Sequence, residues 1–165
     1  MILPILEYPD KRLRTVAKPV EKINDTVNKL IKDMFDTLYN APGIGLAATQ
    51  VDCHQRIIVV DVSENQNEPI SLINPEIIDK SGEIESEEGC LSVPSYYENV
   101  KRANNIMVKS LNQNGDAVQT NASEMLAICI QHEIDHLDGI LFVDHLSKLK
   151  QKRLKKKTHK KSKQL

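Results

Sequence analysis

The stretch QHEIDH, late in the chain, constrains this sequence more than any other feature. It lies in the largely apolar run EMLAICIQHEIDHL, which starts after Ser123 and is followed by Gly139, so we expect a helix with a glycine at its C-terminal end. Residues four apart lie one above the other on a helix, which puts His132 and His136 on one face beside Glu133. Because the run is largely apolar, we expect this helix to be buried, and its buried polar side chains then need partners. The pattern therefore predicts a metal site with Glu133 as a built-in base.

A catalytic metal needs a third protein ligand, with one position left open for water. No residue downstream of this helix is suitable as the third ligand. Phe142 stands where one peptidase pattern carries its third histidine, and His145 lies three residues too far along. No glutamate follows Glu133, which removes the other common peptidase arrangement. The third ligand must therefore lie upstream.

The upstream candidates are the cysteines, of which the chain has three. Cys129 and His136 would lie about 10 Å apart along a helix axis, too far to share one ion easily. Cys53 has no distinctive setting and is expected to be a buried thiol. Cys90 follows Gly89 in the segment EEGCLS, where the backbone can approach another element closely. The need for a ligand therefore favours Cys90.

The remaining pattern indicates an α+β fold. Apolar residues at helical spacing predict a helix over 27–38, and β-branched runs predict strands over 56–62 and 70–78. The segment 104–120 is typical of a hairpin that turns at Asn-Gly. From about residue 147 a basic segment has the spacing of a third helix. Strands thus fill the middle and helices lie at both ends.

Composition bounds the setting. A chain of 165 residues fits one domain, and 40% hydrophobic with 27% charged residues is ordinary for a globular protein. An odd number of cysteines and the absence of a signal-peptide pattern argue against a disulfide framework. No apolar run is long enough for a membrane span. We therefore expect a cytoplasmic protein that does not interact with membranes.

Three motifs occur in a fixed order: GIGLAATQ at 43–50, EGCLS at 88–92 and QHEIDH at 131–136. Together with VAKPV, LINPE and the basic C-terminal segment, they resemble the bacterial peptide deformylases over nearly the whole chain. The resemblance implies antiparallel sheets packed around a central HExxH helix, with an N-terminal helix and a basic C-terminal helix. It also implies a catalytic domain over 1–147 and a separate basic tail over 148–165.

The resemblance implies a metal-dependent hydrolase that removes the formyl group from the N-terminal formylmethionine of nascent polypeptides. In the family the cysteine of the second motif, here Cys90, joins the two histidines, here His132 and His136, around one divalent ion. That ion is expected to be Fe(II), with Zn, Ni or Co possible in a purified form.

The resemblance also assigns roles in the chemistry. Glu133 matches the family's catalytic acid and base. Gln50 and the backbone N–H of Leu91 match the groups that hold the developing oxyanion. Gly45 matches a glycine beside the substrate, and Gly89 is expected to let the substrate backbone approach.

A methionine side chain needs an apolar pocket, and the candidates for its walls are Ile44, Met125, Ile128 and Cys129. Two positions depart from the family pattern. Ser86 stands where related enzymes often carry an apolar residue, and Tyr97 where some carry an arginine near the substrate backbone. Both departures bear on substrate affinity and downstream preference, and neither affects the metal ligands.

Charge is divided unevenly along the chain. Residues 148–165 hold ten of the 22 Lys and Arg residues and no Asp or Glu, which leaves 12 cations against 23 carboxylates in the preceding residues. Such a basic block suits rRNA phosphates. We expect the tail to dock on the ribosome, with Leu146, Leu149 and Leu154 anchoring its first turns on the body. The protein itself is expected to be a monomer.

Two other classes of protein compete with the deformylase. A related metallopeptidase would need the ligand that the chain lacks downstream of the helix. An RNA-binding protein with a structural zinc would need four protein ligands, whereas the chain offers three and a base.

Overall fold

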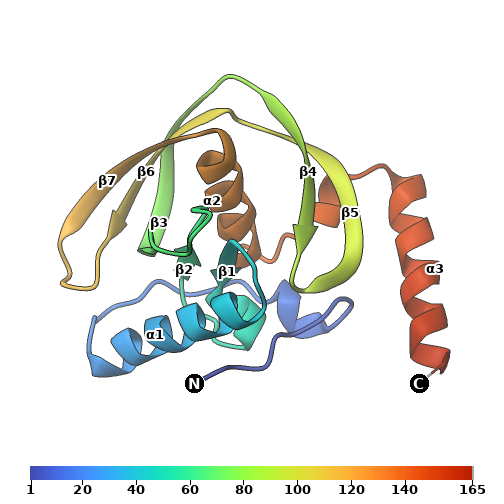
Figure 1. Cartoon of the computed structure of the whole chain (residues 1–165), viewed down its shortest axis with the longest axis horizontal. Helices are drawn as coiled ribbons and strands as arrows, with labels where there is room; N and C mark the ends of the chain where they lie inside the picture. The colour runs from blue at the N-terminus through green and yellow to red at the C-terminus, as the bar shows by residue number, and fades with distance from the viewer. Residues whose placement is uncertain (165) are drawn as a thin grey trace.

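The computed structural model describes the backbone of residues 1–164 and the side chains of residues 1–158; Leu165, the end of the expected tail, lies outside the described residues. A five-stranded antiparallel sheet has the order β1-β2-β3-β6-β7, and a separate two-stranded sheet pairs β4 with β5. Helix α2 (Glu124–Leu137) lies between these sheets, with α1 (Asp25–Asn40) below and α3 (Lys148–Gln164) beside β5 (Figure 1). The predicted α+β arrangement around a central helix is confirmed.

The N-terminal helix forms where the apolar spacing predicts it. The side chain of Asn24 accepts a hydrogen bond from the backbone N–H of Val27, which caps the first turn of α1. The buried face includes Ile31, Met34 and Leu38 and packs on one side of the larger sheet. The helix therefore packs against the sheet that contains the first motif.

The larger sheet carries the first motif. Its strands are β1 (Gly45–Ala47), β2 (Ile57–Val60), β3 (Ile70–Ser81), β6 (Asn105–Leu111) and β7 (Ala117–Ser123). The predicted hairpin at Asn114-Gly115 joins β6 to β7, with Gly115 at φ +85°. After β1, the chain forms the 3₁₀ turn η2 (Ala48–Val51), which contains the end of the motif and contacts α2.

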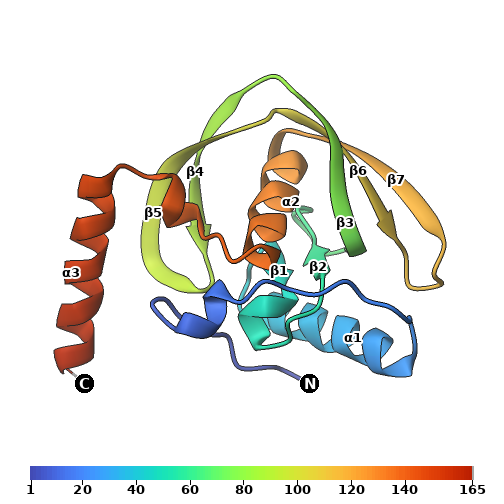
Figure 2. The same ribbon diagram turned by 180° about the vertical axis from the view of Figure 1, so that it is seen from behind.

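The strands β4 (Ile84–Cys90) and β5 (Val93–Arg102) were not predicted. They form a hairpin on the other side of α2, and the two views in Figures 1 and 2 show it separated from the larger sheet by that helix. Residues of β4 alternate between inward and outward positions, but the inward ones include Ser86 and Glu88. Because these are polar, the usual apolar alternation is missing.

The C-terminal end of α2 is closed as expected. Gly139 has φ +76°, a region that favours glycine, and its N–H donates to the carbonyl of His136. A Cβ at this position would lie 2.7 Å from the carbonyl oxygen of Arg14, so the backbone of two segments meets here. The side chains of Arg14 and Asp144 form an ion pair that joins the short 3₁₀ turns η1 (Lys11–Arg14) and η3 (Phe142–His145).

Helix α3 begins at Lys148 and contacts the body through part of its first turns. Leu146, just before the helix, and Leu154 are buried in a cluster with Phe142 and Val93. The prediction that Leu149 anchors the tail is wrong, because its side chain is 60% exposed. Leu149 and Leu154 are five residues apart, so they point in different directions from the helix axis. In the part of the chain that the structure describes, no helix could cross a membrane.

Candidate metal and active site

The three predicted ligands come together from two elements. His132 and His136 project from α2, and Cys90 ends β4 at an irregularity in the hairpin, opposite Val93. One ligand atom from each of the three lies within 4.8 Å of the other two, and Sγ of Cys90 is 3.3 Å from Nε2 of His136. Ligand atoms on one tetrahedral ion lie about 3.5 Å apart. This donor set therefore fits a divalent metal with small side-chain adjustments.

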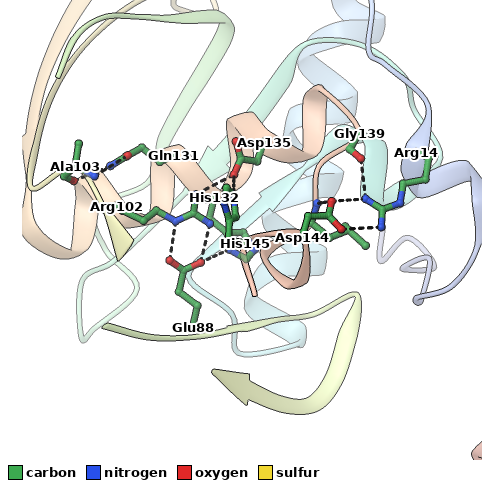
Figure 3. A network of polar contacts seen from close by, with 11 residues as sticks. Arg14, Glu88, Arg102, Ala103, Gln131, His132, Asp135, Gly139, Asp144 and His145 are labelled. Carbon is green, nitrogen blue, oxygen red and sulfur yellow. Dashed lines mark hydrogen bonds and ion pairs between the residues drawn. The ribbon is translucent and has the colours of Figure 1, made fainter. Parts of the chain in front are cut away.

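A buried ion-pair network fixes the first of these ligands (Figure 3). Oε1 of Glu88 lies 2.8 Å from Nδ1 of His132, which leaves Nε2 of that ring as the atom that can bind a metal. The guanidinium of Arg102 donates two hydrogen bonds to Glu88, at 2.7 and 2.8 Å, and a third to Asp135 at 2.8 Å. The same oxygen of Asp135 contacts Nε2 of His145 at 2.9 Å.

Two further features act on the histidines. The ring of Phe142 stacks on His132 with centroids 5.9 Å apart, and Tyr96 of β5 packs against Phe142 with centroids 6.1 Å apart. Burial, with the positive charges of His132 and Arg102, lowers the pKa of His136. Neutral imidazole is the form that binds a metal, so the environment favours the ligand state.

Glu133 is buried beside the ligands. Burial raises the pKa of its carboxyl to about 7. Its Oε1 has no hydrogen-bond partner among the residues that the structure describes. A Cβ on Gly45 would lie 2.5 Å from Oε2 of Glu133 and 2.6 Å from Sγ of Cys129, so only glycine leaves room here. The carboxyl is thus placed to exchange a proton with a bound molecule.

The amide of Gln50 is held rigidly next to the ligand sulfur. Its Oε1 accepts from the N–H of Ala47 at 2.9 Å, which leaves the NH₂ group pointing into the site. That group donates to Oγ of Ser92 at 3.0 Å and to Sγ of Cys90 at 3.6 Å. The amide is therefore a fixed donor beside the group of residues that could hold a metal.

A pocket of about 380 Å³ opens beside these residues. Its lining includes Gln50, Cys90, Leu91, His132 and Glu133 together with all the candidate substrate residues: Ile44, Gly45, Gly89, Met125, Ile128 and Cys129. This volume is in the range of small-molecule sites. Ile44 and Met125 are 45% and 50% exposed and lie at the mouth, whereas Ile128 and Cys129 are buried. Both departures, Ser86 and Tyr97, also line the pocket.

Two cysteines are not ligands in this arrangement. The thiol of Cys129 donates to the carbonyl oxygen of Ile44 at 3.5 Å. Cys53 packs at the edge of the cluster formed by α1 and the larger sheet and does not line the pocket. The prediction that Cys53 is a buried thiol holds only in part, since its side chain is partly exposed.

Several residues around the site were missed from the sequence. Glu88, Arg102 and Asp135 support His132, and Ser92 supports Gln50. Only Glu88 offered a signal, because it stands two residues before Cys90 and would share its face in a strand. The partners of Arg102 lie 14 and 33 residues away in the sequence, and no local pattern indicates them.

The fold and the site define a metal-dependent hydrolase with an HExxH helix. The family model "Polypeptide deformylase" matches residues 2–152. The chain is similar to the peptide deformylase of Pseudoalteromonas translucida, 56% identical over 98% of this chain and 96% of that protein, and to that of Cellvibrio japonicus, 54% identical over 98% and 96%.

Solved structures agree with this match. The crystal structure of a peptide deformylase from Legionella pneumophila has a TM-score of 0.93 and 47% identity, covering 99% of this chain and 96% of that one. The Ehrlichia chaffeensis peptide deformylase in complex with actinonin has a TM-score of 0.93 and 42% identity, with 97% of each chain covered. This chain belongs to the peptide deformylase family. It is a metal-dependent enzyme that removes the formyl group from N-formylmethionyl peptides.

Proposed function

We propose that Cys90, His132 and His136 hold the metal, and that Glu133 carries protons between water and substrate. The observation that supports this most directly is the position of Glu133. It is 4% exposed, lines the pocket and lies next to the ligand group, with one oxygen free of protein partners. A carboxyl with a pKa near 7 can both accept and return a proton near neutral pH.

A metal held by Cys90, His132 and His136 would supply a nucleophilic water near neutral pH, because it would lower the pKa of that water. Glu133 takes the proton of the attacking water. It then returns this proton to the leaving amine as the formyl C–N bond breaks. The products are formate and a peptide with a free N-terminal methionine.

Gln50 and the backbone N–H of Leu91 stabilise the oxyanion that develops on the formyl group. The NH₂ of Gln50 is already oriented by Ala47 and Ser92, so little reorganisation is needed during the reaction. One such donor contributes about 3 kcal/mol to the stability of the transition state. Gly45 and Gly89 line the pocket that takes the substrate; the missing Cβ leaves room for Glu133 and Cys129 at Gly45 and for the ring of Tyr97 at Gly89.

The metal is Fe(II) in this proposal. Two imidazoles and one thiolate also suit zinc, nickel and cobalt, so a purified form can carry any of these ions. The arrangement does not support a structural zinc, because a fourth protein ligand is absent among the residues described and a pocket opens at the site. A peptidase role lacks a supporting observation.

The substrate is the nascent chain, which places the enzyme in the cytoplasm near the ribosome. We divide the protein into a catalytic body, 1–147, and a basic helix, 148–165. The basic helix docks on rRNA. The enzyme acts as a monomer. On α3, Lys155, Lys156 and Lys157 are exposed, whereas Leu154 is buried against the body. The helix is thus fixed at one side and presents these three cations outward.

The test compares formate release with peptide cleavage. Enzyme prepared without oxygen is given formyl-Met-Ala-Ser and, separately, an unformylated peptide with internal methionine. Formate release with no cleavage is expected. Glu133→Ala should retain one metal per chain and lose about 10²- to 10⁴-fold in turnover. Substantial turnover by the metal-loaded variant would remove Glu133 from its role.

A further inference from the structure

Ser86 puts a hydroxyl group on the wall of the pocket that receives the methionine side chain. In the β4–β5 register Ser86 lies opposite Val100, which is 3% exposed, so both side chains face inward. Glu88, the next inward residue of β4, reaches His132 of α2. Ser86 therefore points toward α2 and into the pocket that it lines.

This hydroxyl lies at the end of the pocket away from the metal ligands. Ser86 precedes Cys90 by four strand residues, about 13 Å. On the facing helix, Met125 precedes His132 by seven residues, about 10 Å. A side chain that starts beside Glu133 and extends along the pocket would thus reach its exposed mouth between Ser86 and Met125.

Besides Ser86, the pocket lining includes apolar side chains, among them Ile44, Met125 and Ile128. Ser86 is half-buried and makes no hydrogen bond with any residue whose side chain the structure describes. A thioether sulfur is only a weak acceptor, so a bound methionine leaves this donor poorly matched. A sulfoxide oxygen at the same position is a strong acceptor.

We propose that Ser86 lets this enzyme deformylate chains whose initiator methionine has been oxidised to the sulfoxide. Oxidation turns the apolar side chain into a polar one, which an entirely apolar pocket would reject. Here the hydroxyl of Ser86 donates to the sulfoxide oxygen, and the exposed mouth at Ile44 and Met125 keeps that oxygen partly hydrated. The reaction is the same hydrolysis, in which water replaces the amine on the formyl carbon. The inference rests on the proposed function of the site.

The test uses two variants of equal shape. Ser86→Thr keeps the hydroxyl, and Ser86→Val replaces it with a methyl group; both β-branched residues suit a strand. For each enzyme, kcat/KM is measured on formyl-Met-Ala-Ser and on each sulfoxide epimer of the same peptide. The quantity compared is the ratio of sulfoxide to methionine. For at least one epimer, Thr should keep the wild-type ratio and Val should lower it about 2- to 12-fold, the range for one hydrogen bond.

A formyl-norleucine peptide serves as the apolar control substrate. The ratio of norleucine to methionine should differ little between the Thr and Val variants, since neither substrate accepts a strong hydrogen bond. Equal sulfoxide ratios in the Thr and Val variants would overturn the role of Ser86. Failure of the wild-type enzyme to release formate from formyl-Met-Ala-Ser would instead reject the proposed function itself.

Discussion

Oε1 of Glu88 lies 2.8 Å from Nδ1 of His132, and both side chains are buried. This contact fixes the ring of a proposed metal ligand through Nδ1 and leaves its Nε2 available. Arg102 in turn holds both oxygens of Glu88. The orientation of His132 therefore depends on residues of the β4–β5 hairpin as well as on the helix that carries it.

Glu88→Gln should weaken metal binding about 10- to 100-fold, as is usual when the outer partner of a ligand is lost. The measurement is the rate at which a chelator removes cobalt, followed by the absorbance of the bound ion. Glu85→Gln is the matched control. Glu85 lies on the same strand but faces outward and is exposed, so its variant should release cobalt at the wild-type rate.

The same carboxylate should make the stability of the metal-free protein sensitive to acid. Burial would raise the pKa of Glu88, but hydrogen bonds from Arg102 and His132 hold it at about 2, below the ordinary 4.5. A depressed pKa means that the unfolded chain takes up the proton first, so the stabilisation is full above pH 4.5 and is lost as the pH falls toward 2.

Urea unfolding at several pH values measures this effect. The difference in the free energy of unfolding between wild type and Glu88→Gln should be largest near pH 6 and shrink toward pH 3. A difference that stays constant over this range would contradict the assignment.

Gly45→Ala should lower turnover because the new methyl group would collide with Oε2 of Glu133 and Sγ of Cys129. Both side chains are buried and cannot move aside easily. Gly43→Ala is the comparison, since the three atoms nearest to its new methyl group would belong to Leu91 and Leu38 and none to Glu133. The measurement is kcat for formate release, with metal content determined in parallel. A loss at Gly43 as large as that at Gly45 would count against steric crowding of Glu133.

Air should inactivate the iron form quickly and spare a nickel-substituted form, because an Fe(II) centre with a thiolate can be oxidised at iron and at sulfur. Activity is followed over time in aerated buffer. Equal lifetimes would argue against iron.

Cys90→Ser should reduce metal retention far more than Cys53→Ser, since Cys53 does not line the pocket. The opposite ranking would reassign the ligand.

Replacing Lys155, Lys156 and Lys157 by Gln should weaken salt-sensitive co-sedimentation with ribosomes and leave turnover on a free formyl-Met tripeptide nearly intact. Substitution is preferable to cutting the chain before Leu154, since loss of this buried residue would disturb the body. The control replaces three exposed lysines of the body, Lys22, Lys80 and Lys109, by Gln. If both triple variants pelleted equally well at low salt, docking through the tail would be rejected.

The sequence by itself determined the features that depend on local spacing. The helix carrying His132, Glu133 and His136 could be predicted because residues four apart share a face, and Gly139 marks its end. The helix α1 and the β6–β7 hairpin followed from periodicity and turn residues in the same way. The division of charge between the body and the C-terminal segment is a property of composition and needs no fold.

Tertiary structure decided what holds this helix in place. Strand β4 could not be predicted because its inward positions carry the polar residues Ser86 and Glu88. Ser86 lines the pocket and Glu88 contacts His132, so neither belongs to an apolar core. Phe142 and His145 could be dismissed as ligands from spacing alone. The fold nevertheless puts Phe142 against the ring of His132 and His145 on Asp135. Such contacts join residues from separate elements, so only the packing of those elements could specify them.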